Sequence, residues 1–209
     1  MLNQLRLIFS FLALLGARAM AAPCDLAHAV HLPNLAAALA THHLSLLVIA
    51  PRTGAADAAT GENDGSLGYR IAAATAAIRP DVALDLDTLD NSGQSVADML
   101  PELANRLSQR PVALVIWQAG TAEIARGTNP ASVSVSLADA TRVIAQANAD
   151  LILVDPDPTL ASLPAAPAIE STLGVAASHR GVAFYAQQRF APAPEACFSH
   201  GIAALIAGA

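Results

Sequence analysis

The decisive stretch of this chain reads Val115-Ile116-Trp117-Gln118-Ala119-Gly120-Thr121-Ala122-Glu123. Its first part belongs to an apolar, β-rich run, residues 112–117, which predicts a strand. Its second part is a polar loop that carries Gly-Thr, so the strand is expected to end in a turn. Residues that follow a buried parallel strand lie at the edge of the sheet where α/β proteins bind ligands. The stretch therefore predicts both a central strand and a candidate site at its carboxyl end.

Outward from this stretch, strand-like apolar runs alternate with helix-like runs. Strands are expected at residues 44–50, 82–87, 112–117, 151–154 and 182–185, and helices at residues 67–78, 94–109, 134–148, 167–178 and 196–206. Ser95 or Ser92 is expected to cap the second of these helices and Pro101 to break it locally. Such alternation implies right-handed crossovers and a sheet covered on both faces. The expected fold is α/β, a flavodoxin-like three-layer sandwich with a five-stranded parallel sheet.

The first residues have the pattern of a secretory signal peptide. A short polar start with one cation precedes an apolar run, residues 7–15, that is too short to span a bilayer. Small residues around Ala21 fit a cleavage site, so residues 1–21 are expected to be removed and the protein to be periplasmic or secreted. A retained anchor helix is the alternative, and a lipoprotein is disfavoured by Pro23. Residues 22–43 are expected to form an N-terminal arm with a helix, and residues 44–209 the main domain.

Composition bounds the class of protein. The chain has 209 residues, which fits one domain, and it is 54% hydrophobic but only 13% charged. The formal net charge of −6 and the lack of a basic cluster argue against nucleic acid and anionic lipid as partners. Apart from the signal there is no candidate transmembrane segment, so no stable membrane anchor is expected. No glycine-rich phosphate loop occurs, and the expected protein is a monomer without a cofactor.

Two cysteines remain after the expected cleavage, Cys24 and Cys197. In an oxidising compartment an even pair predicts a disulfide. This bridge would join the N-terminal arm to the last helix, and a loop of that length is worth about 4 to 5 kcal/mol in the chain-entropy model. Two free buried thiols are the alternative.

The chain resembles the SGNH, or GDSL, hydrolases over most of its length after the signal, and is most similar to secreted bacterial members of that family. The resemblance is carried by the opening stretch, by the Cys24-containing arm, and by Ala97-Asp98-Met99-Leu100, Arg126-Gly127 and Val154-Asp155-Pro156. It implies the family's three-layer fold and an ester-hydrolysing site. The family's third block runs from an apolar strand into Gly-Thr-Asn-Asp, and here the last two positions are Ala122 and Glu123.

The resemblance places the family's nucleophilic serine directly after the first strand, where a base can reach it. In this chain the position falls on Arg52, whose guanidinium stays protonated and cannot attack an ester. Thr53 is the nearby hydroxyl and the fallback nucleophile, although its methyl group hinders attack. Ser66 stands in a Gly-Ser-Leu motif but lies well beyond the strand, so it is expected to be a helix N-cap.

The other groups of the family's site are only partly present. Gly93 matches the glycine whose backbone N–H helps to stabilise the oxyanion. Ala122 lacks the side-chain donor of the third block, a loss typically worth about 10²–10³-fold in rate, and Glu123 beside it would repel an oxyanion. The Asp-x-x-His that supplies the family's base has no counterpart in residues 186–196. His179 and His200 are expected to be ordinary helix residues rather than replacements for it.

No metal site is predicted. Two pairs of histidines lie close in sequence, His28 with His31 and His42 with His43. The second pair is expected to face apart on a helix at the wrong end of the sheet, and the first to bind metal only adventitiously. Asp85, Asp87 and Asp90 alternate along and beyond a strand. A solvated strand end is the expected role for them, with Asp87 a candidate to face the cleft.

Two functions from different classes follow. The first is a secreted SGNH-fold protein that has lost esterase activity and has a cell-envelope binding or accessory role. Its cleft would hold Arg52, Thr53, Gly93, Glu123 and Asp155, with Arg52 paired with Glu123 or bound to an acidic sugar or acyl carboxylate. A protein partner is a further alternative. The second function is a working esterase, deacetylase or acyltransferase on cell-envelope glycan or lipid, which would need an atypical site.

Overall fold

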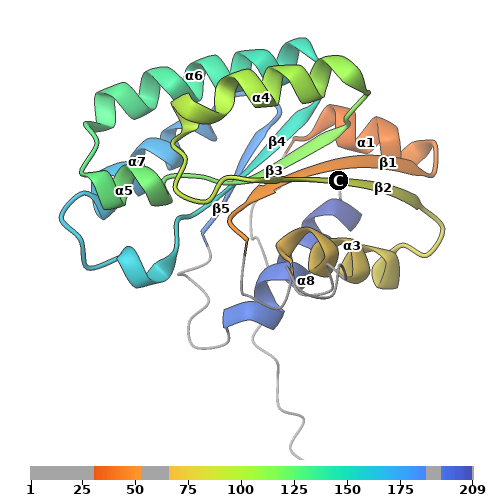
Figure 1. Ribbon diagram of the computed structural model, residues 1–209. Coiled ribbons are helices and arrows are strands. Elements are labelled where there is room, and N and C mark those ends of the chain that lie inside the picture. The colour runs from red at the N-terminus through yellow and green to blue at the C-terminus, as the bar shows by residue number, and fades with distance from the viewer. Residues whose placement is uncertain (1–30, 53–65, 187–193, 209) are drawn as a thin grey trace, which may run out of the picture.

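The computed structural model describes residues 31–52, 66–186 and 194–208, and residues 194–198 by their backbone only. Within them one parallel sheet contains β1 (His43–Ala50), β2 (Ala83–Asp90), β3 (Leu114–Gln118), β4 (Asp150–Val154) and β5 (Val182–Tyr185). The strand order is β2-β1-β3-β4-β5, which confirms the predicted flavodoxin-like sheet (Figure 1). The chain changes direction across the sheet between β1 and β3, so a ligand site is expected where these two strands end.

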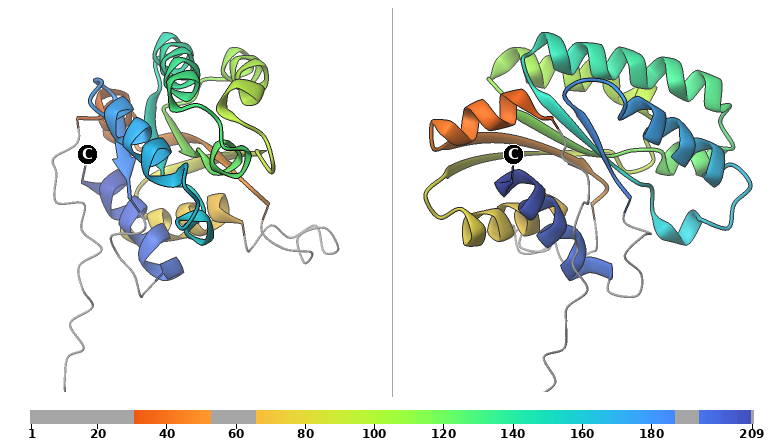
Figure 2. Two further views of the ribbon diagram at one scale, coloured as in Figure 1. Left: turned by 90° about the vertical axis from the view of Figure 1, so that its left-hand side faces the viewer. Right: turned by 180° about the vertical axis from the view of Figure 1, so that it is seen from behind.

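Helices cover both faces of this sheet (Figures 1 and 2). One face carries α4 (Val96–Gln109), α6 (Pro130–Gln146) and α7 (Ala166–Ala176), and the other carries α1 (Pro33–Ala40), α3 (Leu67–Ile78) and α8 (Pro194–Ala207). Two short helices follow strands directly, α5 (Thr121–Arg126) after β3 and the 3₁₀ helix η1 (Pro158–Leu160) after β4. Among the described residues no helix combines the length and apolar character needed to cross a membrane.

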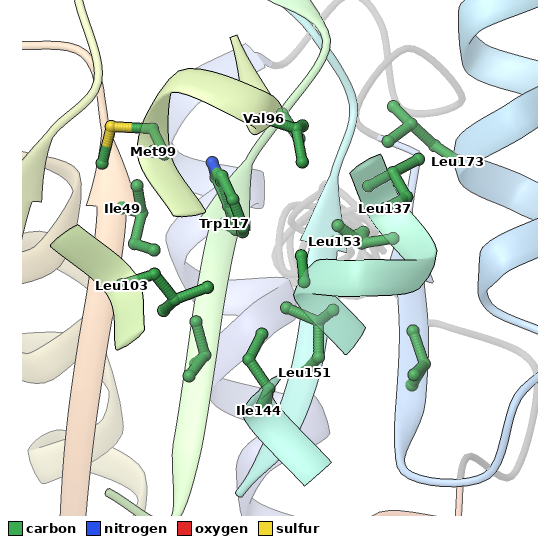
Figure 3. Close-up of a cluster of buried hydrophobic side chains, with 14 of the residues drawn as sticks. Ile49, Val96, Met99, Leu103, Trp117, Leu137, Ile144, Leu151, Leu153 and Leu173 are labelled. Carbon is green, nitrogen blue, oxygen red and sulfur yellow. The ribbon is translucent and has the colours of Figure 1, made fainter. Parts of the chain in front are cut away.

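The core consists of two apolar clusters, one on each side of the sheet. Successive residues of β3 alternate between them, because side chains of a strand point to opposite faces: Val115 and Trp117 join one cluster, and Leu114 and Ile116 the other. Figure 3 shows Trp117 among side chains of α4 and of the neighbouring strands. Trp117 is 1% exposed. Burial on both faces explains why this strand is a continuous apolar run in the sequence.

Several elements differ from the sequence-based expectation at their ends. The helix expected from residue 134 begins at Pro130, since the Asn129 side chain accepts the Ala131 N–H and proline suits the first turn. Pro101 does not break α4, which runs to Gln109. Pro101 is exposed near the start of the helix, and Ala97, whose carbonyl loses its helical donor, is exposed as well. The short helix α5 lies where the sequence predicts a polar loop, and η1 has no counterpart among the predicted elements.

The amino edge of the sheet corrects one expectation about histidines. His42 and His43 do not lie on a helix: His42 has a φ of 56° in the turn after α1, and His43 begins β1. The His42 ring lies 3.0 Å from Asp81 at the exposed amino edge, far along β1 from its carboxyl end. Thr53, His28, Cys24 and the expected signal peptide lie outside the described residues, as does the Cys197 side chain.

Candidate active-site region

The carboxyl edge of the sheet gathers most of the residues that the sequence singles out. Arg52 follows β1, Gly93 follows β2, Glu123 lies in the helix after β3, and Asp155 follows β4. Neighbouring loops are joined directly, since the Asn91 side chain donates to the carbonyl oxygen of Gln118 over 2.8 Å. The parallel sheet therefore brings these positions to one edge, as expected from the sequence.

The backbone of Arg52 is held by hydrogen bonds, whereas its side chain is exposed. Its N–H lies 3.3 Å from Oδ1 of Asp90 and 3.2 Å from Oγ of Ser92. The side chain is 75% exposed, and its Nε lies 3.6 Å from Oδ2 of Asp90. A separation of 3.6 Å is an ion pair without a good hydrogen bond, so within residues 31–52, 66–186 and 194–208 most of the guanidinium donors have no partner.

Asp90 organises the start of the β2–α4 loop. Its Oδ1 accepts from the Ser92 backbone N–H at 2.9 Å and from the Ser92 hydroxyl at 2.5 Å. Partial burial raises the pKa of Asp90, but the hydrogen bonds from Ser92 and Arg52 outweigh this effect and hold the pKa below its ordinary value. Asp90 is therefore a structural carboxylate and a weak base toward the Ser92 hydroxyl.

Gly93 lies in a tight turn that leaves its surroundings open. The Gln94 N–H donates to the Asn91 carbonyl at 2.9 Å, and Gly93 has a φ of +68°. A Cβ on Gly93 would meet nothing within 4 Å. No acceptor for the Gly93 N–H is present in residues 31–52, 66–186 and 194–208. An exposed amide of this kind is satisfied by water or by a ligand.

Glu123 does not pair with Arg52, so that expectation is wrong. Its side chain is turned inward by α5 and is 2% exposed. Oε1 accepts the backbone N–H of Val96 at 2.6 Å, at the start of α4. A carboxylate is favoured there because the first amides of a helix lack partners and carry partial positive charge. Glu123 thus has a structural role at the start of α4.

The rest of the third block is also structural. Ala122 is 8% exposed and has no side-chain donor. Gly120 has a φ of +93°, and a Cβ there would lie 2.9 Å from Pro156 Cγ. The Thr121 hydroxyl accepts the Asp157 N–H at 3.3 Å, which joins the β3 loop to the β4 loop.

Asp155 is buried and does not line an open cleft. It is 2% exposed and its N–H donates to the Tyr185 carbonyl at 3.1 Å. Burial raises the pKa of the Tyr185 phenol to about 12, and the nearby charge of Asp155 adds to the rise. These two residues belong to the core between β4 and β5.

Other sequence candidates have ordinary roles. The Ser66 hydroxyl accepts the Tyr69 N–H, which confirms that Ser66 is the N-cap of α3. Asp87 does not face the cleft, because it pairs with Arg106 of α4 at 3.0 Å. His179 and His200 are exposed. Among the described residues no group of three or more His, Cys, Asp or Glu side chains could hold a metal ion.

Arg126 is the residue that the sequence reading missed. From the end of α5 its Nη2 donates to the Gly93 carbonyl at 2.5 Å, and its Nη1 donates to Oδ2 of Asp98 at 3.0 Å. Hydrogen bonds from Ser95 and then from Arg126 lower the pKa of Asp98 to about 2. The sequence drew attention to Arg126-Gly127 only through the resemblance. The contacts of Arg126 could not be predicted, because its partners in the β2–α4 loop and at the start of α4 are far away in the sequence.

Comparisons with known proteins agree with this fold. A family model, described as the Non-GDSL lipase-like family, matches residues 19–191. No curated protein matches the chain. The chain is similar in structure to a variant of Axe2, an acetyl-xylooligosaccharide esterase from Geobacillus Stearmophilus, with a TM-score of 0.58 and 14% identity over 79% of this chain and 94% of that one.

Two further solved structures are similar. One is the psychrotrophic esterase EstA from Pseudoalteromonas sp., with a TM-score of 0.55 and 16% identity over 68% of this chain and 76% of that chain. The other is AlinE4, an SGNH-hydrolase family esterase, with a TM-score of 0.53 and 15% identity over 68% and 75%. At such identities these likenesses establish the SGNH hydrolase fold alone. Because the family model spans most of the sequence, the chain belongs to the Non-GDSL lipase-like family.

Proposed function

We propose that this protein is a secreted, non-catalytic member of its family that binds a carboxylate-bearing ligand, an acidic sugar or acyl carboxylate of the cell envelope, at the carboxyl edge of its sheet. The observation that carries the proposal is Arg52. It stands where the resemblance puts the family's nucleophile, its backbone is anchored by Asp90 and Ser92, and its side chain is 75% exposed. In this proposal an exposed cation takes the place of the group that would attack an ester.

Three losses together argue against ester hydrolysis. Arg52 removes the nucleophile, Ala122 removes one oxyanion donor, and residues 186–196 contain neither His nor Asp to serve as base and orienting acid. Ser92 does not compensate, because its hydroxyl donates to a carboxylate whose lowered pKa makes it a poor proton acceptor. The described residues thus offer no activated hydroxyl.

The same region favours binding of an anion. Arginine recognises a carboxylate through parallel N–H donors, and among the described residues the Arg52 side chain makes only a loose contact, with Asp90. The open Gly93 amide is two residues along the turn from Asn91 and directly beside Ser92, which contacts the Arg52 backbone. The Arg52 guanidinium and the Gly93 amide thus belong to two loops that are in contact, and a guanidinium with a backbone donor suits a planar carboxylate.

Covalent labelling tests the loss of chemistry. The purified protein is expected to take up no fluorophosphonate probe and to hydrolyse short p-nitrophenyl esters no faster than the Thr53→Ala and Ser92→Ala variants. An intact SGNH esterase treated in parallel supplies the positive control. Labelling or turnover that disappears in Thr53→Ala would make the protein an ester hydrolase with a threonine nucleophile and would overturn the proposal.

Secretion and the disulfide form part of the proposal and rest on the sequence. We expect the mature protein in the periplasm or medium, cleaved near Ala21, with Cys24 joined to Cys197. Peptide mapping of the exported protein without reductant checks both features, since it gives the new N-terminus and a linked Cys24–Cys197 peptide pair. Exported protein with two alkylatable thiols would rule out the bridge.

A further inference from the structure

The β2–α4 loop is held by Arg126 of α5 as well as by its contact with the Arg52 backbone. Arg126 places one guanidinium nitrogen 2.5 Å from the Gly93 carbonyl oxygen and another 3.0 Å from Asp98. A planar guanidinium that makes two bonds in different directions fixes its own orientation. The carbonyl of Gly93 is therefore held toward α5.

Asp98 is itself immobilised. Its Oδ2 accepts the Ser95 N–H at 2.9 Å while the Ser95 hydroxyl accepts the Asp98 N–H at 3.2 Å, which forms a capping box at the start of α4. Asp98 thus links the helix start to Arg126. A pKa lowered to about 2 keeps the carboxylate charged throughout the neutral range.

The Gly93 turn needs such support because glycine has little conformational preference of its own. At a φ of +68°, with nothing within 4 Å of a Cβ position, no packing restrains the residue. The bond from the Gln94 N–H to Asn91 closes the turn, and the bond from Arg126 fixes the peptide that follows Gly93. Without Arg126 the Gly93–Gln94 peptide would lose this bond, and the φ and ψ angles of Gly93, which set the direction of its N–H, would vary more widely.

We infer that Arg126 is a positioning residue: by holding the Gly93 carbonyl, it aims the Gly93 N–H at the ligand that Arg52 attracts. The inference rests on the proposed function and narrows it. The ligand is a planar carboxylate that takes one hydrogen bond from a fixed backbone amide, in addition to the charge of Arg52. A donor fixed before binding raises affinity because less ordering accompanies association.

The test compares Arg126→Gln and Arg126→Lys with Arg142→Gln. Arg142 is a matched control, because it pairs with Asp139 at 2.6 Å on α6 and has a similar exposure, 60% against 52% for Arg126. Sodium glucuronate is titrated by calorimetry, with glucose as the neutral probe. The order parameter of the Gly93 N–H is measured by ¹⁵N relaxation without ligand.

Arg126→Gln is expected to weaken glucuronate binding about five- to tenfold and to lower the Gly93 order parameter from about 0.85 toward 0.6. Arg126→Lys keeps the charge but cannot make both bonds well. Its affinity for glucuronate and its Gly93 order parameter should lie between those of the wild type and Arg126→Gln. Arg142→Gln should change neither quantity. Glucuronate binding by the wild type that is unaltered in Arg126→Gln, with an unaltered order parameter, would overturn this inference alone. A wild type that binds no glucuronate would overturn the proposed function instead.

Discussion

Gly120→Ala is expected to lower the melting temperature by about 5 to 15 °C. Two effects add. Alanine is strained at a φ of +93°, which costs about 1–3 kcal/mol. Its methyl group would also lie 2.9 Å from Pro156 Cγ and 3.0 Å from Ile169 Cγ2, and overpacking of this kind costs about 1–3 kcal/mol more. Thermal unfolding followed by circular dichroism measures the sum.

Gly127→Ala is the matched control at the other end of α5. Gly127 has a φ of +62°, but nothing lies within 4 Å of its Cβ position. This variant therefore carries strain without a clash, about 1 kcal/mol. Equal losses in the two variants would show that Pro156 and Ile169 do not pack closely on Gly120, and that the loops after β3 and β4 are not locked together as described.

Asp150→Ala is the second substitution with a large expected effect. The Asp150 side chain is buried at the amino end of β4 and accepts the Leu35 N–H at 2.8 Å and the Asn34 side-chain N–H at 3.0 Å. These bonds fasten the start of α1 to the sheet. Alanine leaves the buried donors unpaired, so the free energy of unfolding should fall by about 2–4 kcal/mol. Chemical denaturation measures it, and a loss below about 0.5 kcal/mol would contradict this role.

The pH dependence of Asp150 has a definite sign. Burial raises the pKa of this carboxyl above its ordinary value, although hydrogen bonds from Leu35 and Asn34 oppose the rise. The folded protein then holds the proton more tightly than the unfolded chain, whose carboxyl titrates near about 3.9. The wild type should therefore gain stability relative to Asp150→Asn as the pH falls from about 7 toward 4. If the wild type instead gained melting temperature relative to Asp150→Asn as the pH rose, the pKa of Asp150 would be lowered, not raised, in the folded protein.

Much of the fold could be predicted because buried strands and helix ends leave local patterns of apolar and capping residues in the sequence. β3 and β4 are buried on both faces, so they are continuous apolar runs that stand out in the sequence. The helix at Leu67–Ile78 has the predicted bounds because Ser66 caps its start and Pro80 follows its end. β2 is harder to delimit, since its residues are mostly exposed or half-buried and it continues past Asp87 to Asp90.

The candidate site could be predicted only where a single position decides the chemistry. Arg52 and Ala122 lack the groups of the family's site whatever the geometry. The roles of Glu123 and Arg126 depend instead on α5, a helix of 6 residues that is too short to leave a periodic pattern. Once that helix forms, Glu123 reaches the Val96 amide and Arg126 reaches Gly93, and neither contact has a local signal in the sequence.

In the proposed function, Arg52 binds a carboxylate at the position where the family has its nucleophile. A calorimetric titration of sodium glucuronate into the wild type, Arg52→Ala and Arg142→Ala tests it most directly. The claim predicts binding by the wild type and by Arg142→Ala, and a loss of at least about tenfold in affinity for Arg52→Ala, since a charged hydrogen-bonded contact is worth about 1.5–3 kcal/mol. Equal affinity of Arg52→Ala and the wild type would contradict it, as would a wild type that binds no carboxylate.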